Sequence, residues 1–157
     1  MLNEYLQFTS SSFIEKDEMF DLSELIKQVV NKYNNENIQK YLTPRLYING
    51  RKNLINRCLN NIIDNALKYG NKVVIKLNKK NTNLLISIDD DGPGISNKEY
   101  ENVFKPFYKI NKSRADAKSS VGLGLSIASD IIRSHGGNIM LEMSKMNGLR
   151  VKIFLPV

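Results

Sequence analysis

Three consecutive carboxylates follow an apolar run near the middle of the chain. The run, residues 84–88 (LLISI), is typical of a buried strand, and residues 89–95 (DDDGPGI) come directly after it. Like charges repel one another and burial penalises each ionised group, so three acids at a strand end are costly. The two glycines of the turn allow backbone conformations that a Cβ would forbid. We therefore expect a group with hydrogen-bond donors to lie against this turn.

The alternation of side chains along a strand distinguishes the three acids. Asp90 shares a face with Ile86 and Ile88, whereas Asp89 and Asp91 lie on the opposite face. If the apolar face points into the core, Asp90 is the carboxylate that points inward, and a buried carboxylate must be hydrogen-bonded. We expect Asp89 and Asp91 to be solvated or bonded to local backbone.

Two simpler interpretations of the acidic turn have to be weighed. A calcium-binding loop fits poorly, because its register of ligands would end at Lys98, where a bidentate Glu is required. An acidic turn satisfied by its own backbone amides is a common arrangement. The stretch alone leaves that second interpretation open.

A polar stripe lies on a helix expected over residues 52–69. Asn61, Asn65 and Tyr69 are spaced four apart, so they share one side of the helix, with Lys68 beside them. Asn is a poor former of helix interiors, although a solvated face tolerates it. An Asn oxygen suits a hard cation such as Mg²⁺, a lysine can meet a phosphate, and a tyrosine ring can stack on a base. Alone, the stripe is a weak signal.

A second glycine pair, Gly122 and Gly124, stands where another helix is expected to begin. Glycine there allows close backbone approach, and the free amides and dipole of a helix start attract anions. An isolated Gly-x-Gly more often serves tight packing alone. The preceding loop, residues 108–121, is polar, basic and aperiodic, so we expect a mobile loop that would act as a lid beside a phosphate site. Phe104 and Phe107 are most simply core aromatics, or anchors for the base of that lid.

Composition limits the possible classes of function. The 157 residues suffice for one domain with a real core, and 41% hydrophobic with 25% charged residues is ordinary for a soluble globular protein. No apolar run is long enough to span a membrane, and no secretory signal is found. Cys58 and His135 are the only residues of their types, which excludes an internal disulfide and disfavours zinc. The net charge of +7 suits an anionic ligand. The sequence lacks the stripe of aromatic and basic residues that is typical of nucleic-acid-binding modules.

The pattern of elements predicts one α+β domain. Asp21 is a candidate N-cap, with Glu24 three residues later, for a helix that reaches Tyr33. Asn49 and Gly50 are expected to turn the chain after a short strand. Because helices and strands segregate along the chain, we expect a two-layer sandwich rather than a doubly wound sheet. The other expected elements are strands at 45–48, 73–78, 84–90, 138–142 and 149–155, and helices at 52–69, 97–104 and 123–135.

Four segments taken together resemble the N, G1, F and G2 boxes of bacterial sensor histidine kinases, most closely those of the osmosensor (EnvZ-like) branch. They occur in the family's order and spacing, and the resemblance covers residues 20–157. Four boxes in register are a strong signal, whereas any one of them would be weak. The segments are residues 61–69 (NIIDNALKY), 90–95 (DDGPGI), 104–109 (FKPFYK) and 122–125 (GLGL).

The resemblance implies the Bergerat (GHKL) fold, a mixed sheet backed by helices, with ATP and Mg²⁺ between the helices and the lid. It implies that Asp90 accepts the adenine amino group and that Asn65 holds Mg²⁺. The catalytic residues implied are Asn61, Asn65, Lys68 and Lys109, with both lysines meeting phosphates. The nucleotide-binding residues implied are Tyr69, Asp90, Gly92, Gly94, Ile95, Phe104, Tyr108, Gly122, Leu123, Gly124 and Leu125.

Two of these residues carry a chemical argument of their own. Adenine offers an amino donor where guanine has a carbonyl, so a buried Asp90 facing guanine would leave two acceptors unpaired, at a cost of about 1–3 kcal/mol or more. The related gyrase, Hsp90-type and MutL ATPases carry Glu at the position of Asn61, where it activates water. Asn cannot take a proton. We therefore expect the site to hold ATP without fast hydrolysis and to leave the γ-phosphate for another acceptor.

Two departures from the family pattern matter. Ser120 precedes Val121 and Gly122 where the family usually has a glycine, which bears on how the lid hinges. No phosphoacceptor helix with a His followed by an acid is found: His135 stands at a helix end, where the dipole favours a cation, and has no acidic neighbour. We expect residues 1–19 to be the remnant of a preceding helical dimerisation domain or linker, and residues 20–157 to be the ATP-binding catalytic domain.

The expected function is donation of the γ-phosphate of ATP to a His on a separate dimerisation domain, in cis or in trans, with a response regulator as an indirect partner. The alternatives are an anti-sigma-type serine kinase of the same superfamily and a nucleotide-binding module without catalysis. We expect no nucleic-acid partner and no membrane contact by this segment. We also expect a cytoplasmic location, with the parent protein anchored in the inner membrane.

Overall fold

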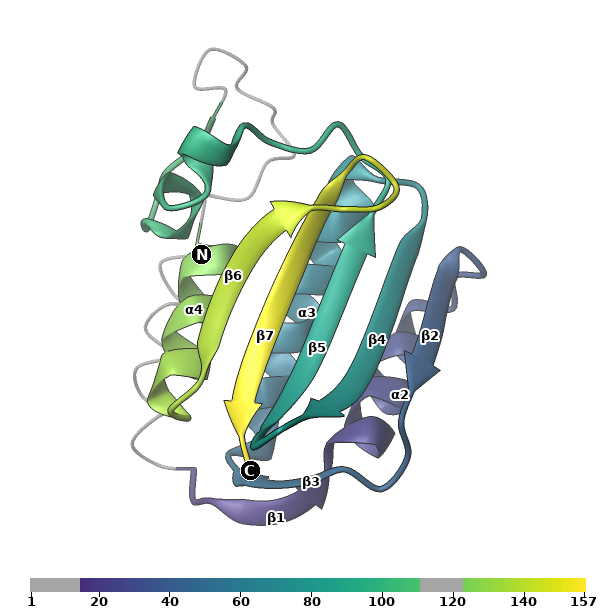
Figure 1. Ribbon diagram of the computed structural model, residues 1–157, viewed down its shortest axis with the longest axis vertical. Coiled ribbons are helices and arrows are strands. Elements are labelled where there is room, and N and C mark those ends of the chain that lie inside the picture. Colours follow the sequence, from purple (N-terminus) through teal and green to yellow (C-terminus); the bar gives the residue numbers. More distant parts are fainter. Residues whose placement is uncertain (1–14, 111–122) are drawn as a thin grey trace.

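A five-stranded mixed sheet forms one layer of the molecule (Figure 1). The computed structural model describes residues 15–110 and 123–157. The strands of this sheet are β2 (Ile38–Leu42), β4 (Val73–Lys80), β5 (Asn83–Asp90), β6 (Asn138–Met143) and β7 (Leu149–Pro156). Their spatial order is β2-β4-β5-β7-β6, with β2 parallel to β4 and every other neighbouring pair antiparallel. The central strand β5, which ends in the acids, is therefore flanked by β4 and β7.

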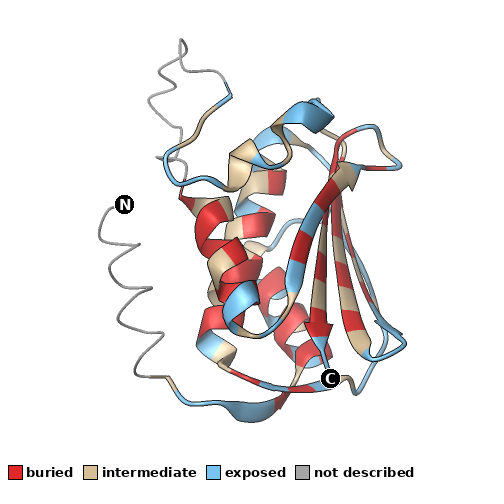
Figure 2. Cartoon of the chain, turned by 60° about the vertical axis from the view of Figure 1, so that its left-hand side comes forward, coloured by how far each residue is buried: buried red, intermediate tan, exposed pale blue. Residues whose placement is uncertain are grey.

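Helices cover one face of this sheet and leave the other uncovered (Figures 1 and 2). Ile63, Ile75 and Ile127, from a helix, a strand and another helix, are fully buried between the two layers. This arrangement confirms the predicted two-layer α+β sandwich. Over the described residues, no helix has the length and apolar character that crossing a bilayer requires. The helices are α2 (Leu22–Tyr33), α3 (Lys52–Tyr69) and α4 (Gly124–Ser134), with short 3-10 turns η1 (Asn97–Glu99) and η2 (Asn102–Phe104).

A small second sheet departs from the sequence prediction. Strand β3 (Tyr47–Gly50) pairs antiparallel with β1 (Glu18–Asp21), so Asn49 and Gly50 lie in a strand and not in a turn. Packing explains the glycine, because a Cβ at Gly50 would stand 2.8 Å from Cδ2 of His135. The turn prediction for these two residues is therefore wrong.

Two further elements differ from expectation. Strand β2 gives no sequence signal, since Gln39, Lys40 and Tyr41 are all exposed and break the apolar alternation. The helix expected at 97–104 is replaced by η1 and η2, neither of which contains a buried residue. The apolar residues of this segment are only partly buried, so a full α-helix would gain little stability from packing.

The start of α3 is capped from outside the helix. Arg51 occupies the N-cap position, and its side chain makes no cap hydrogen bond. Instead the carboxylate of Glu15 accepts the backbone N–H of Asn53 at 2.7 Å and that of Leu54 at 3.2 Å. The first amides of a helix have no partner within it and attract negative charge, so Glu15 fastens the preceding segment to α3.

His135 follows the end of α4 as predicted, but it is neutral and not a cation favoured by the helix dipole. Its Nε2 accepts the backbone N–H of Arg51 at 3.0 Å, which assigns the ring proton to Nδ1. Nδ1 in turn donates to the carbonyl of Ile131 at 2.7 Å. Burial lowers the pKa of His135, and the bond to the Ile131 carbonyl opposes that shift. The fold uses the uncharged ring.

Asp21 is the N-cap of α2, as predicted, because its Oδ1 accepts the N–H of Ser23 at 2.9 Å and of Glu24 at 3.4 Å. Asp21→Ala should lower the free energy of unfolding by about 1 kcal/mol, the usual cost of a lost cap. Urea denaturation measures this loss. Asp21→Asn keeps an acceptor oxygen and should remain close to the wild type; equal losses in both variants would contradict the capping role.

The neutral state of His135 predicts that stability depends on pH. Because its pKa in the folded chain lies below its ordinary value of about 6.5, the unfolded chain takes up the proton first as the pH falls. The contribution to the free energy of unfolding is therefore complete above about pH 7 and is lost as the pH falls below about 6.5. Urea denaturation at about pH 7.5 and 5.5 tests this dependence.

His135→Asn supplies the matched control for that measurement, because His135 is the only histidine and Asn does not titrate. The variant should be less stable at high pH and should lose less stability on acidification than the wild type. Parallel pH profiles for the two proteins would show that the ring is not held neutral.

Candidate functional site

Asp90 ends β5 with its side chain buried. Its Oδ1 accepts the backbone N–H of Gly92 at 2.9 Å and that of Leu149 at 3.1 Å. Among the described residues, its Oδ2 has no hydrogen-bond partner. Burial raises the pKa of Asp90, the two amide bonds oppose that rise, and the charges of Asp91 and Asp89 add to it. Local backbone therefore does not satisfy this acid by itself, and one oxygen is left to meet a donor.

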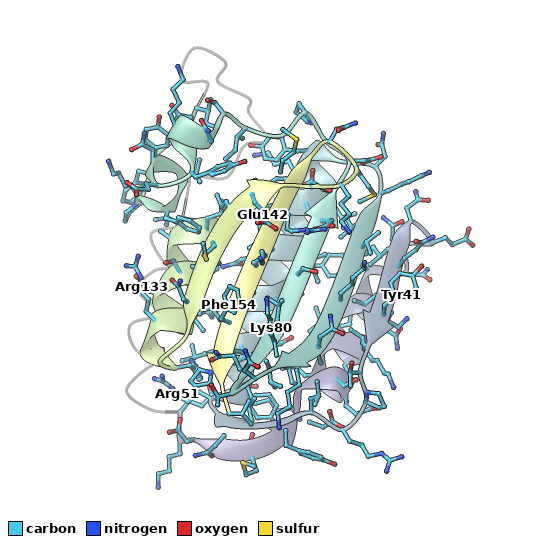
Figure 3. All side chains as sticks on the ribbon, viewed as in Figure 1. Tyr41, Arg51, Lys80, Arg133, Glu142 and Phe154 are labelled. Carbon is cyan, nitrogen blue, oxygen red and sulfur yellow. The ribbon has the colours of Figure 1, made fainter. Side chains whose placement is uncertain are left out.

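Asp89 is buried as well, so the expectation that it is solvated or bonded to local backbone is wrong. It pairs with Arg150 of β7 through two bonds, Nε to Oδ1 at 2.6 Å and Nη2 to Oδ2 at 2.7 Å. The two residues face each other in the β5–β7 register. Glu142 of β6, labelled in Figure 3, also contacts this guanidinium at 3.3 Å. Arg150 thus covers Asp89 on the sheet face without helices, and the alternation of side chains along β5 does not reveal this partner.

Asp91 bonds to backbone, but to the loop after α3 and not to its own turn. Its Oδ1 accepts the N–H of Asn71 at 2.7 Å and that of Lys72 at 2.9 Å. These two amide bonds lower the pKa of Asp91. Three neighbouring acids therefore contact three different parts of the fold.

The glycines around the acidic turn allow backbone segments to approach closely. A Cβ on Gly92 would stand 2.7 Å from the carbonyl oxygen of Tyr69, at the end of α3. A Cβ on Gly148 would stand 2.3 Å from Oδ1 of Asp90. Gly148 and Leu149 complete the surroundings of Asp90 and were not predicted as site residues, because residues 147–148 give only a turn signal. Gly94 has φ +68°, in the left-handed region that favours glycine.

The polar stripe of α3 reaches the start of α4. Nδ2 of Asn61 donates to the carbonyl of Gly124 at 3.3 Å, which brings two of the predicted segments into contact. Asn65, one turn further along α3, is half-buried and makes no side-chain hydrogen bond to a described residue. Its amide oxygen is therefore available to a ligand.

Lys68 and Tyr69 form the exposed last turn of α3. Nζ of Lys68 lies 5.3 Å from the centroid of the Tyr69 ring, within the range of a cation–π interaction. The tyrosine is 55% exposed, so its ring is not fixed in the core. Because the carbonyl of Tyr69 lies against Gly92, a cation and an aromatic surface stand next to the acidic turn.

The segment after the acidic turn places its aromatic residues differently. Ile95 and Phe104 pack partly buried against the core. Phe107 is 58% exposed, so the prediction of a core aromatic is wrong for it. The hydroxyl of Tyr108 donates to the Glu99 carboxylate, and this hydrogen bond raises the pKa of Tyr108.

Helix α4 begins at Gly124 without a side-chain cap, since Leu123 at the N-cap position makes none. Leu123 is buried, and Leu125 packs partly buried on the core. An uncapped first turn leaves backbone amides that attract anions. Gly122 and most of the predicted lid, residues 111–121, lie outside the described residues, whereas Lys109 lies within them.

These residues together offer a buried acceptor, an aromatic ring, a lysine and an uncapped helix start. The acceptor suits the amino group of a base, and the lysine and helix start suit phosphates. No cluster of three His, Cys, Asp or Glu side chains able to hold a metal occurs in residues 15–110 and 123–157. Asn65 alone fits a metal that takes one amide oxygen and completes its shell with water and phosphate, as Mg²⁺ does.

Comparison with known proteins places the chain in a family. The family model described as "Histidine kinase-, DNA gyrase B-, and HSP90-like ATPase" matches residues 50–157. The sensor histidine kinase CpxA of Escherichia coli (strain K12) is 37% identical over 109 residues, which cover 69% of this chain and 24% of CpxA. The chain thus spans about a quarter of the length of that relative.

Solved structures of similar proteins extend the likeness to the fold. The mycobacterial sensor histidine kinase MprB has a TM-score of 0.77 at 25% identity, over 89% of this chain and 97% of that one. The histidine kinase domain of the E. coli osmosensor EnvZ has a TM-score of 0.69 at 29% identity, over 89% of this chain and 88% of that one. The matched family model includes α3, the acidic turn and α4. The chain therefore belongs to the histidine kinase-, DNA gyrase B- and HSP90-like ATPase family, and within that family it is similar to the ATP-binding catalytic domains of sensor histidine kinases.

Proposed function

We propose that this domain binds ATP with Mg²⁺ and donates the γ-phosphate to a His on a separate phosphoacceptor domain. The observation that carries the proposal is the buried Asp90, whose Oδ2 is unpaired among the described residues beside the last turn of α3. The similar proteins are named as sensor histidine kinases, which favours a histidine acceptor over a serine. In this proposal the domain works in the cytoplasm, the parent protein is anchored in the inner membrane, and a response regulator receives the phosphate.

Asp90 would select adenine. Oδ1 is occupied by the amides of Gly92 and Leu149, so Oδ2 is the atom that accepts the adenine amino group. Guanine would turn a carbonyl toward the same oxygen and leave two acceptors facing each other. The selection of adenine over guanine thus depends on whether the base donates a hydrogen bond to Oδ2 of Asp90.

Asn61 would preserve the nucleotide for transfer. Its amide donates to the carbonyl of Gly124 and has no basic atom that could take a proton from water. The residue therefore organises the contact between α3 and α4 without activating a hydrolytic water. Slow hydrolysis leaves the γ-phosphate for a protein acceptor.

The remaining residues would orient the phosphates. Asn65 would hold Mg²⁺ through its amide oxygen, and Lys68 and Lys109 would meet phosphate oxygens. When bound, Mg²⁺ supplies neutralisation of the charge on the transferring phosphoryl group. Tyr69 would line the base, next to the turn at Gly92. The chain contributes mainly positioning.

Asp90→Asn should weaken ATP binding by roughly 5- to 150-fold, the factor that corresponds to about 1–3 kcal/mol for an unsatisfied polar pair. The carboxamide can keep one oxygen toward the two amides, but its NH₂ group then faces the adenine amino donor. Isothermal titration with Mg²⁺ and a non-hydrolysable ATP analogue measures the change.

Asp21→Asn is the matched control, because it makes the same substitution at a helix cap remote from the site and keeps the capping oxygen. It should bind the analogue as the wild type does. Unchanged affinity in Asp90→Asn would contradict the assignment of the pocket, and tight binding of a GTP analogue by the wild type would contradict its selectivity.

The isolated chain should bind ATP without phosphorylating itself. Both ring nitrogens of His135 are engaged, one by the N–H of Arg51 and one by the carbonyl of Ile131, so no nucleophilic nitrogen is free. With γ-labelled ATP, label should appear only after a His-bearing dimerisation domain is added, and it should be acid-labile. Acid-stable label on a serine of a partner would instead support the serine kinase alternative.

A further inference from the structure

Asp91, the acid that follows Asp90, bonds to the loop after α3. Oδ1 of Asp91 accepts the N–H of Asn71 at 2.7 Å and of Lys72 at 2.9 Å, and the N–H of Asp91 donates to the carbonyl of Lys72 at 3.3 Å. All three bonds join the acidic turn to the loop between α3 and β4. We propose that Asp91 is a positioning residue for nucleotide binding, which fixes the end of α3 against Asp90; this inference rests on the proposed function.

The loop that Asp91 holds is in contact with the pocket. The N–H of Gly70 bonds to the carbonyl of Ala66 at 2.8 Å and closes α3. A Cβ at Gly70 would stand 3.0 Å from Cβ of Asp90 and 3.0 Å from Oδ1 of Asp91, so the helix end lies directly on the two acids. The carbonyl oxygen of Tyr69 lies equally close to Gly92, where a Cβ would stand 2.7 Å from it. A shift of this loop would therefore move the Tyr69 ring relative to the acceptor.

The ionised form of Asp91 suits this role. Its two amide bonds are charge-assisted and lower its pKa, so the carboxylate remains charged at neutral pH. One oxygen accepts both bonds, and an Asn side chain can present an oxygen in the same place. A Glu side chain carries the same charge on a longer arm and cannot place its oxygen between the two amides.

Asp89 performs a matching task on the other side of the turn. Its two bonds to Arg150 hold β7, and the next residue back, Leu149, supplies an amide to Asp90. Asp89 thus holds β7 on one side of Asp90, and Asp91 holds the loop after α3 on the other side. The end of α3 next to that loop carries Lys68 and Tyr69, which the proposed function assigns to the nucleotide.

Three substitutions separate positioning from simple stabilisation. Asp91→Ala and Asp91→Glu should each weaken binding of ADP with Mg²⁺ by at least about tenfold, since small misplacements of a binding group are costly, while Asp91→Asn should stay close to the wild type. Isothermal titration measures the affinity, and urea denaturation measures stability in parallel. Net charge alone predicts the opposite order for the Glu and Asn variants.

Asp21→Ala is the matched control, because it also removes a carboxylate that accepts two backbone amides, far from the acidic turn. It should lose stability and keep its affinity for ADP. Affinity in Asp91→Ala equal to that of Asp21→Ala, or a Glu variant that binds as tightly as the wild type, would overturn the proposal.

Amide hydrogen exchange gives a readout that needs no nucleotide. In the wild type the amides of Asn71 and Lys72 should be protected, and in Asp91→Glu they should exchange at least about tenfold faster, because the acceptor has moved. Unchanged exchange at both amides would overturn the proposal even if the affinity fell. Failure of the wild type to bind ADP would count against the proposed function and would leave the exchange result to decide the role of Asp91.

Discussion

Burying a carboxylate at the end of a strand is unfavourable unless donors reach it, and the donors that reach Asp90 come from two directions. Gly92 lies in the same turn, but Leu149 begins β7, far along the chain. The second donor is available only because β7 pairs with β5 in the centre of the sheet. Gly148 then has no room for a side chain, since Asp90 occupies that space. The pairing of β7 with β5 thus places a donor beside the acid of the candidate site.

The charge of Asp90 also depends on its neighbours. Asp89 and Asp91 both raise the pKa of Asp90, because adjacent negative charges disfavour its ionised form. Arg150 counters one of them through a bidentate pair, and hydrogen bonding to Asp89 raises the pKa of Arg150 itself. Backbone amides counter the other. An arginine thus stabilises the charge of Asp89, and two backbone amides stabilise the charge of Asp91. Each set of bonds also holds a segment of the fold in place.

Much of the fold follows from apolar periodicity. The helices with a buried face, α2, α3 and α4, were predicted close to their observed bounds because helical spacing reports burial directly. Strand β2 was not predicted, because its parallel pairing with β4 is made by backbone and its three central side chains are exposed. Periodicity detects what is buried, and backbone pairing at a sheet edge leaves little trace in the sequence.

The site shows the same division. Strand parity correctly gave Asp90 as the inward acid, since parity is a local property. It misjudged Asp89, because the side chain that covers it, Arg150, comes from a strand 61 residues later. Gly148 and Leu149 were missed for the same reason. Phe107 was misplaced because an aromatic residue type suggests burial, whereas its exposure is decided by the turn that carries it.

Helix α3 is held by contacts at both of its ends and at its middle. Its first amides are bound by Glu15, and the loop that follows its last turn is bound by Asp91, so carboxylates from outside the helix hold both ends. Between them, Asn61 bonds to the first residue of α4. A helix held at both ends and at its middle cannot slide along its axis without breaking one of these contacts. Asn65 and Lys68 are therefore kept at a fixed height relative to Asp90, and that spacing is what a nucleotide with a base at one end and phosphates at the other would require.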